Sequence, residues 1–293
     1  MLLLRARSRV KRTRILAPFM GPAAAAWGWM LPRMSQSPAI ETQVRLPTGS
    51  VLSIPPRAHF FWDLWTGLYE KDVADVLRAL LTEGMGVIDT GANIGYHSIL
   101  MSELVGPSGR VYAFEPDPHT FGYLQRNMAA NNCTNVELIS KAVSDQSGEA
   151  PFVSAGWGSF IPRDGSHEEI SSQVQTTTID AFFKAKGWPT IDLIKMDIEG
   201  SELAALLGMG ELSRRNSGLT MIMEFNIPAM RRAGTSPPVV ADILAKLRFG
   251  RSYVIEQGLY ALPDGQLLPD NRLVSNLLLV KSGLTIRGLK LAT

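Results

Sequence analysis

An apolar run that leads into an aspartate and two glycines is the most informative chemical feature of the sequence. Residues 87–98 read VIDTGANIGYHS. A strand ending at Asp89 would place Gly91, Ala92, Asn93 and Gly95 in the turn before the next helix. Glycine lets the backbone approach a ligand closely, and the free amides at a helix N-terminus attract an anion. We therefore expect these residues to form a cofactor-binding loop.

A second acid follows this loop at a distance typical of ribose recognition. The next apolar segment, RVYAFEP, ends in Glu115 and Pro116, and Glu115 lies 24 residues after Gly91. In open parallel sheets, an acid about 20 residues beyond the glycine turn accepts hydrogen bonds from ribose hydroxyls. We therefore expect a cofactor that contains a ribose, with Glu115 as the acceptor and Pro116 in the same binding segment.

The composition of the loop favours S-adenosylmethionine over a dinucleotide. A dinucleotide site typically has three closely spaced glycines, GxGxxG, which admit a pyrophosphate. Here Ala92 and Asn93 fill the turn, and Asp89 precedes it. A carboxylate at this place would repel a pyrophosphate but attract a cationic sulfonium and the amine attached to it. An NAD-dependent oxidoreductase is therefore the less favoured alternative.

The residues expected to carry the reaction lie at the ends of two later strands. Asp197 and Glu199 follow the apolar run of IDLIKMDIEGSE, Lys195 lies two residues before Asp197, and Glu224 lies in IMEFN. Methyl transfer to oxygen requires removal of the hydroxyl proton, or an alkoxide held by lysine or a metal. We predict that these four residues are catalytic. Metal independence is slightly favoured, with magnesium as the alternative; Glu202 is expected to be only a first-turn helix residue.

A mostly parallel sheet is the element that would bring these residues together. Seven segments are predicted strands: GVIDT, RVYAFEP, NVELISKAV, IDLIKMD, LTMIMEF, SYVIEQ and NLLLVKS. Helical patterns between the first five predict parallel strands with helices on both faces. A Pro-Asp-Gly loop joins the last two and predicts a hairpin, hence one antiparallel strand. Residues 152–169, which are rich in glycine, are a candidate substrate lid.

Charge and composition divide the chain into three parts. Seven of the 29 Lys and Arg residues precede the first acid, Glu41, which leaves 22 basic and 27 acidic residues afterwards. Without a basic excess in the body, no nucleic-acid partner is expected. Residues 1–40 are predicted to be a disordered or targeting tail, residues 41–86 a cap of a hairpin and a helix, and residues 87–285 the catalytic domain. The apolar run of the tail is short and contains proline, so a stable membrane span is not expected.

Four blocks of the sequence together resemble a known family. VIDTGANIGYHSIL, GRVYAFEPDPHTFGYLQRNMAANN, VELISKAVSDQSG and IDLIKMDIEGSE follow one another. In this order they resemble the FkbM family of S-adenosylmethionine-dependent methyltransferases. The resemblance implies a Rossmann-like class I methyltransferase fold and methyl transfer, usually to a hydroxyl of a sugar or natural product. It also places Ala142 and Asp145, in the block AVSD, near the adenine of the cofactor.

The expected partner is a small molecule or glycan that accepts the methyl group. The expected location is the cytoplasm, with membrane association or export through the N-terminal tail as the alternative. Tyr69 and Glu70, just before the first predicted helix, are expected to close the cofactor pocket. Three other functions stay open: transfer to nitrogen, binding of S-adenosylmethionine without catalysis, and oxidoreduction. The sequence IDLIKMDIEG lacks the Asn-Pro-Pro-Tyr motif of adenine and glutamine N-methylation, so transfer to oxygen is favoured.

Overall fold

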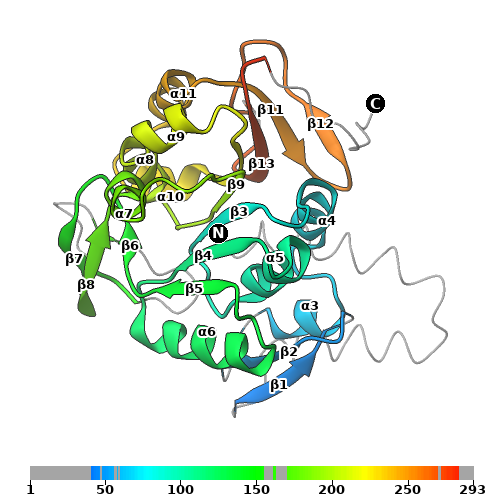
Figure 1. Cartoon of the computed structure of the whole chain (residues 1–293). Coiled ribbons are helices and arrows are strands. Elements are labelled where there is room, and N and C mark those ends of the chain that lie inside the picture. The colour runs from blue at the N-terminus through cyan, green and yellow to red at the C-terminus, as the bar shows by residue number, and fades with distance from the viewer. Residues whose placement is uncertain are drawn as a thin grey trace, which may run out of the picture.

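An eight-stranded sheet forms the centre of the structure, a computed structural model (Figure 1). The model describes residues 41–46, 48–55, 58, 60–154, 161–162, 170–269 and 272–283. The sheet order is β12-β11-β13-β10-β9-β3-β4-β5. Its strands are β3 (Gly86–Thr90), β4 (Arg110–Phe114), β5 (Val136–Ile139), β9 (Leu193–Met196), β10 (Thr220–Asn226), β11 (Phe249–Ile255), β12 (Leu259–Ala261) and β13 (Val274–Lys281). The predicted tail and most of the predicted lid lie outside the described residues.

The directions of the strands confirm the predicted α/β fold. Strands β5, β4, β3, β9 and β10 are parallel to one another. Strand β13 lies between β10 and β11 and is antiparallel to both, as expected for a hairpin at the end of the sheet. This is the mostly parallel sheet with one antiparallel strand that the sequence predicts. The short strand β12 pairs with β11 and extends the seven predicted strands by an eighth at the edge.

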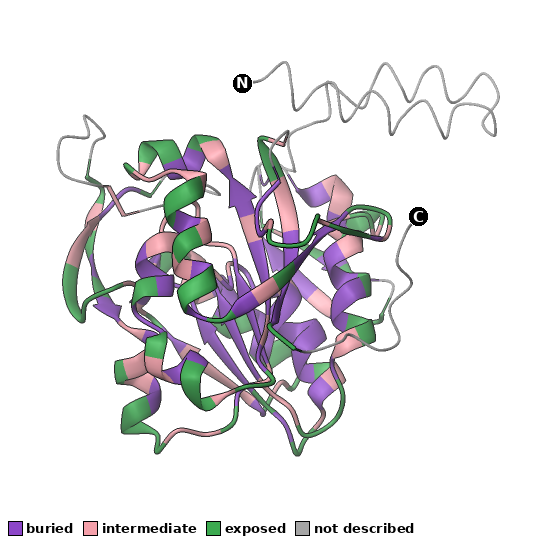
Figure 2. Cartoon of the chain, turned by 90° about the horizontal axis from the view of Figure 1, so that it is seen from above, coloured by how far each residue is buried: buried purple, intermediate pink, exposed green. Residues whose placement is uncertain are grey.

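Helices cover both faces of this sheet, and the strand side chains alternate between two apolar layers. Val87, Leu193 and Ile222 pack with the helices α4 (Lys71–Leu80) and α5 (Tyr96–Val105). The neighbouring side chains, such as Ile88 and Ile194, pack on the opposite face. That face is covered by α7 (Ile179–Ala185), α8 (Glu202–Leu207), α9 (Gly210–Arg215) and α11 (Pro237–Lys246). Figure 2 shows the buried strands between these layers.

The prediction that NVELISKAV forms one strand is wrong. After β5 the backbone N–H of Lys141 donates to the carbonyl of Ile139 at 2.9 Å, and this tight turn ends the strand. The chain continues as β6 (Ala142–Val143), which pairs with β8 (Ser172–Thr177), and β8 also pairs with β7 (Gly148–Phe152). These three strands form a second, smaller sheet beside the main one (Figure 1).

The segment before β3 packs onto the main body through α6 (Pro118–Ala130). It contains the hairpin of β1 (Thr42–Arg45) and β2 (Val51–Ile54), then α3 (Phe61–Trp65) and α4. Leu52 and Leu64 from this segment share one buried cluster with Ile99 of α5 and Leu124 of α6. The remaining helix, α10 (Ile227–Arg232), follows β10 directly. Within the described ranges, no helix is long and apolar enough to span a membrane.

Candidate functional site

The predicted loop turns sharply at the end of β3, and this turn requires glycine at two positions. Gly91 has φ +76° and Gly95 has φ +95°, values that favour glycine. A Cβ atom on Gly91 would overlap the backbone carbonyl oxygen of Asp197, the residue that follows β9. A Cβ atom on Gly95 would overlap side chains of α6, among them Met128. The loop therefore packs closely against β9 on one side and α6 on the other. Ala92, between the glycines, is buried.

Glu115 is buried directly after β4 and is held by two backbone groups. Its Oε2 accepts a hydrogen bond from the N–H of Asn93, and its Oε1 accepts one from the N–H of Asp117, each at 2.9 Å. Burial raises the pKa of Glu115 to about 7, although both hydrogen bonds lower it. Asn93, with φ +54°, thereby connects the loop to the end of β4. Each oxygen of Glu115 retains capacity to accept a further hydrogen bond.

Asp89 and Lys195 are neighbours on the face of the sheet that α4 and α5 cover. They are register partners on β3 and β9, two residues beyond Val87 and Leu193, so their side chains lie on the same face. The Oδ2 atom of Asp89 accepts a hydrogen bond from Ser98 at 2.6 Å. Its Oδ1 atom is buried and has no hydrogen-bond partner among the described residues. Burial raises the pKa of Asp89.

Lys195 and the predicted catalytic acids gather at the ends of β9 and β10. Lys195 donates to Oδ2 of Asp197 at 3.2 Å. Burial lowers the pKa of Lys195. The negative charges of Asp197, Asp89 and Glu70 outweigh this effect and raise the pKa above its ordinary value. Glu224 accepts a hydrogen bond from the side chain of Asn226 at 3.2 Å. Burial raises the pKa of Glu224 well above its ordinary value, and Asp197 contributes next.

The turn after β9 depends on a buried acid that was not predicted to be functional. Glu199 has φ +53° and Gly200 has φ +106°, so the chain turns sharply before α8. Oε1 of Glu202 accepts the backbone N–H groups of Ile198 and Gly200 at 3.3 and 3.2 Å. Glu202 is the first residue of α8, as expected, but its side chain is buried rather than solvated. It therefore stabilises the turn that follows Asp197.

The residues before α4 contact the first turn of α5 and so lie beside the same site. Glu70 precedes α4 in a left-handed conformation, with φ 41° and ψ 38°. Its Oε2 lies 3.4 Å from Nδ1 of the buried His97 on α5. Tyr69 packs against Tyr96 with ring centroids 5.2 Å apart. Burial raises the pKa of the Tyr69 hydroxyl well above 10.0, and the charges of Glu70 and Asp197 add to this shift. That Tyr69 and Glu70 close the cofactor pocket stays a prediction. Their contacts with Tyr96 and His97 depend on the packing of α4 on α5, for which the sequence contains no signal.

The remaining predicted cofactor residues lie nearer the small sheet. Pro116 is half-buried between Glu115 and Asp117. Ala142 is buried in β6, and Asp145, just beyond β6, is exposed and accepts a hydrogen bond from Ser144 at 3.1 Å. These positions follow β5, the edge strand of the main sheet, which pairs with β4, the strand before Glu115. Their assignment to the adenine stays a prediction.

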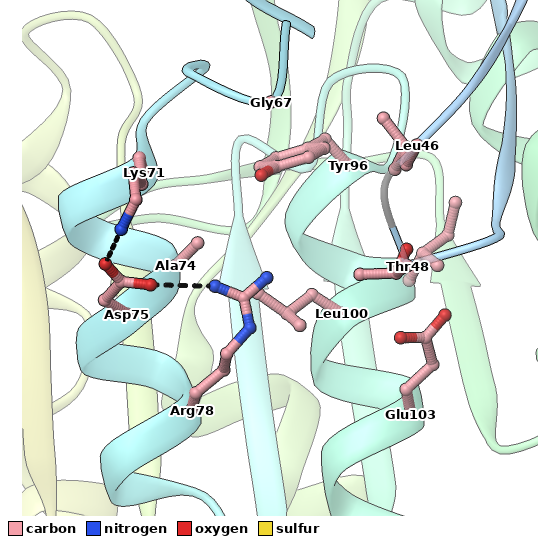
Figure 3. A pocket seen from close by; sticks show the side chains of 11 residues that line it. Leu46, Thr48, Gly67, Lys71, Ala74, Asp75, Arg78, Tyr96, Leu100 and Glu103 are labelled. Atoms are coloured by element: carbon pink, nitrogen blue, oxygen red, sulfur yellow. Dashed lines mark hydrogen bonds and ion pairs between the residues drawn. The ribbon is translucent and has the colours of Figure 1, made fainter. Parts of the chain in front are cut away.

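A cavity of about 180 Å³ lies between α4, α5 and the turn after β1, and Tyr96 is part of its lining. Figure 3 shows Arg78 and Asp75 of α4 facing Leu100 and Glu103 of α5 across it. None of the predicted site residues lines it. Among the residues that the structure describes, no group of three His, Cys, Asp or Glu side chains is arranged to hold a metal ion.

Comparisons with known proteins agree with the predicted family. The family model described as "Methyltransferase FkbM domain" matches residues 89–251, more than half of the chain. The chain is 33% identical over 192 residues to the hexuronic acid methyltransferase AglP of Haloferax volcanii, covering 64% of this chain and 73% of that protein. It is 27% identical over 157 residues to the methyltransferase sdnD of Sordaria araneosa, covering 43% of this chain and 60% of that protein.

Solved structures of methyltransferases are more distant. The TYW2 protein of M. jannaschii, in complex with AdoMet, has a TM-score of 0.45 at 16% identity, covering 83% of this chain and 85% of that one. A SAM-dependent O-methyltransferase of Thermotoga maritima has a TM-score of 0.43 at 14% identity, covering 84% and 79%. The family match and the relative from Haloferax volcanii confirm the predicted resemblance: the chain belongs to the FkbM family of methyltransferases, whose cofactor is S-adenosylmethionine.

Proposed function

We propose that this methyltransferase transfers the methyl group to a hydroxyl of a small molecule, a sugar or a glycan. The observation that carries the proposal is the position of Asp197, which directly follows β9. It contacts the cofactor loop at Gly91 and pairs with Lys195. The relative AglP is described as acting on hexuronic acid, which supports a sugar as the acceptor.

The residues at the strand ends fit S-adenosylmethionine. Glu115 keeps acceptor capacity on both oxygens, as two ribose hydroxyls would require, and the buried Oδ1 of Asp89 has no partner among the described residues. Gly91 and Gly95 allow the loop to turn beneath the ligand. When bound, the cofactor supplies an electrophilic methyl group attached to a positively charged sulfur. An acidic cluster suits this charge better than it suits a pyrophosphate.

In this proposal Asp197 orients the acceptor and receives its proton. Lys195 donates a hydrogen bond to Oδ2 of Asp197 at 3.2 Å and holds the carboxylate in place. A carboxylate is a weak base for an alcohol. Asp197 therefore acts by holding the hydroxyl in line with the methyl group and accepting its proton late in the transition state. We propose that Glu199 and Glu224 bind other polar groups of the acceptor from the next turn and the next strand.

The test is methyl transfer from isotopically labelled S-adenosylmethionine to a panel of neutral sugars, hexuronic acids and amines, followed by mass spectrometry. We expect the label on oxygen. With saturating cofactor, Asp197→Asn is expected to lower turnover about a hundredfold or more while changing the Kd of S-adenosylhomocysteine less than threefold. Glu115→Ala is expected to raise that Kd about ten- to a hundredfold, because a charged hydrogen bond to the ribose is lost.

Three results would contradict parts of this proposal. Label on nitrogen would assign the protein to N-methylation instead. Full activity of Asp197→Asn would remove Asp197 from the mechanism. Treatment with a chelator is expected to leave wild-type turnover unchanged; if it abolished turnover and magnesium restored it, the carboxylates would act as metal ligands.

A further inference from the structure

Strand β13 places a polar side chain beside the acids proposed to bind the acceptor. Asn276 on β13 is the register partner of Glu224 on β10. Two residues farther into the sheet, Leu278 and Ile222 are also register partners, and both pack on the face that α4 and α5 cover. Because side chains two residues apart in a strand point to the same face, Glu224 and Asn276 lie next to each other on that face.

The same row of side chains continues from Glu224 to Asp197. Met196 and Met223 are register partners, so the residues that follow them, Asp197 and Glu224, are neighbours at the ends of β9 and β10. The hydrogen bond from Lys195 shows that Asp197 turns toward the face that α4 and α5 cover. The charge of Asp197 also raises the pKa of Glu224, as expected for adjacent carboxylates. Three polar side chains therefore lie in order across three adjacent strands: Asp197, Glu224 and Asn276.

The amide of Asn276 is not used by the protein itself. Asn276 is half-buried, and its amide has no hydrogen-bond partner among the residues that the structure describes. Its other register partner, Ile255 on β11, is apolar and buried, and Glu224 accepts its hydrogen bond from Asn226 instead. A side-chain amide carries two donors and an acceptor, which together can bind a hydroxyl as donor or as acceptor. This capacity lies in the row that begins at Asp197.

The width of the row fits one sugar ring. Asp197 and Asn276 are two strands apart, which corresponds to about 10 Å between their backbone positions. If both side chains stand upright from the sheet, hydrogen bonds of about 2.8 Å at each end leave about 4 Å between the two oxygens that they bind. That separation lies within the range of two hydroxyls on a single ring. A simple alcohol, with one hydroxyl, would not reach both residues.

We propose that Asn276 binds a second hydroxyl of the sugar whose first hydroxyl Asp197 orients, and that Asn276 thereby determines which polyhydroxylated acceptors the enzyme accepts. The proposal rests on the proposed function, methyl transfer to a hydroxyl. Asn276 acts away from the reacting atoms, so its role is specificity rather than catalysis. It also lies beyond residues 89–251, so the strand that follows the matched family domain would complete the acceptor site.

Sugars that lack one hydroxyl at a time test this role. The probes are the hexuronic acids and neutral sugars of the panel above, each with its monodeoxy analogues, and the assay is transfer of the labelled methyl group. A site that hydrogen-bonds a hydroxyl rejects the analogue that lacks it. For a sugar that is methylated, wild type should therefore use one deoxy analogue with a kcat/KM about tenfold lower than that of the parent sugar.

Asn276→Ala should remove this discrimination. Its kcat/KM for the parent sugar should fall about tenfold, mainly through KM, because the lost hydrogen bond forms equally in the ground state and the transition state. For the discriminating deoxy analogue, Asn276→Ala and wild type should be equally active, since the same hydrogen bond is absent in both. A merely structural role of Asn276 would lower activity toward both sugars alike.

Two further variants keep the comparison decisive. Asn276→Leu has nearly the same shape as the native residue but no polar group, and it should show the same loss of discrimination even if Asn276→Ala perturbed the strand. The matched control is Ser275→Ala: Ser275 is adjacent in β13 but points to the opposite face, and its buried Oγ has no partner among the described residues, so the change should leave discrimination as in wild type. All variants should keep the Kd of S-adenosylhomocysteine within twofold of wild type.

The possible failures can be told apart. If wild type used every deoxy analogue as well as the parent sugar, or if Asn276→Ala and Asn276→Leu kept the wild-type discrimination, Asn276 would have no role in acceptor binding. Equal losses toward all sugars in both variants would also overturn the proposal. A wild type that transferred the label to amines but to no sugar would refute the proposed function, and the role of Asn276 with it.

Discussion

Glu70 precedes α4, Glu115 follows β4 and Glu202 begins α8, yet burial raises the pKa of each to about 7. In each case the loss of solvation is the largest cause, and a neighbouring carboxylate, Asp197 or Asp117, adds to it. A buried carboxylate costs free energy unless it is paired or hydrogen-bonded. A positively charged cofactor beside these acids would favour their ionised forms, so binding and ionisation should support each other.

Glu202 allows the cost of such burial to be measured apart from cofactor binding. Its folded-state pKa of about 7 exceeds the ordinary value of 4.5, so between these values the folded protein keeps a proton that the unfolded chain has lost. The free energy of unfolding should therefore fall as pH rises through this window, by at most about 3 kcal/mol from this group. Glu202→Gln, which cannot ionise, should lack this contribution.

The measurement is urea unfolding of wild type and Glu202→Gln at pH 5 and pH 8. Between the two pH values the variant should gain stability relative to wild type, because wild-type Glu202 must ionise without a partner for Oε2 among the described residues. Acids that do not interact with Glu202 contribute equally to both proteins and cancel in the difference. Glu202 also raises the pKa of Glu224, so the loss of its charge in the variant changes the difference in the same direction. Parallel pH dependences would show that Glu202 does not hold its proton in the folded state.

At the residue scale, the sequence predicts the positions of side chains that lie at the ends of apolar strands. Asp89, Glu115 and Asp197 each come directly at a strand end, so an apolar run locates them. The burial of Glu202 could not be predicted, because an acid in the first turn of a helix is usually solvated. The contact of His97 with Glu70 depends on a left-handed backbone at Glu70, for which the sequence carries no signal.

At the scale of elements, apolar runs identified the long strands, whereas short polar strands had no such pattern. The segments that became β3, β4, β9, β10, β11 and β13 are buried along most of their length. In β8, by contrast, Gln173 and Gln175 are exposed, and β6 has only two residues. These strands form through pairing with one another, which is a tertiary effect that local patterns do not encode. The small sheet was therefore missed.

The turn between β3 and α5 provides a test at this scale. Gly91→Ala should lower the free energy of unfolding by about 3 kcal/mol or more, for two reasons. The added Cβ would overlap the carbonyl oxygen of Asp197, and the φ of residue 91, +76°, is unfavourable for alanine. Gly187→Ala is the matched control: φ is +73°, but nothing lies within 4 Å of the added Cβ. Its expected cost is about 1 kcal/mol, from the backbone alone.

Chemical denaturation and calorimetry with S-adenosylhomocysteine would check both glycines. Gly91→Ala should also weaken binding strongly, since relief of the overlap moves the loop away from β9, whereas Gly187→Ala should bind as wild type does. If the two variants were equally stable, the close packing of the loop on Asp197 would be refuted.

At the scale of the whole molecule, Asn127 of α6 and Asn131, which caps the C-terminus of that helix, join the first hairpin to the body. Oδ1 of Asn127 accepts the N–H of Ser53 at 2.7 Å, and its Nδ2 donates to the carbonyls of Ser53 and Ile94. One turn later, Asn131 pairs in the same way with Val51. Four helical residues rise about 6 Å and two strand residues about 6.6 Å, so the spacings match. Asn127 and Asn131 thus supply hydrogen-bond partners for the backbone groups of Ser53 and Val51 on the edge of β2 that faces α6.

These contacts concern the predicted cap. The sequence predicts that residues 41–86 form a cap of a hairpin and a helix before the catalytic domain. In the structure, side chains of that segment share a buried cluster with α5 and α6, and Glu70 lies at the strand ends. We therefore expect the cap and the body to unfold together.

Asn127→Ala tests this coupling. It would leave three buried backbone groups without partners, the N–H and C=O of Ser53 and the C=O of Ile94, at a total cost of about 3–5 kcal/mol. Asn131→Ala should cost only about 1 kcal/mol, because Asn131 is half-buried and water can replace its amide. Urea unfolding would be followed by far-UV circular dichroism and by tryptophan fluorescence, to which Trp62 and Trp65 near the hairpin contribute. Coincident transitions are expected in wild type; a fluorescence change that preceded the loss of helix, or equal costs for the two variants, would show that the hairpin is only loosely attached.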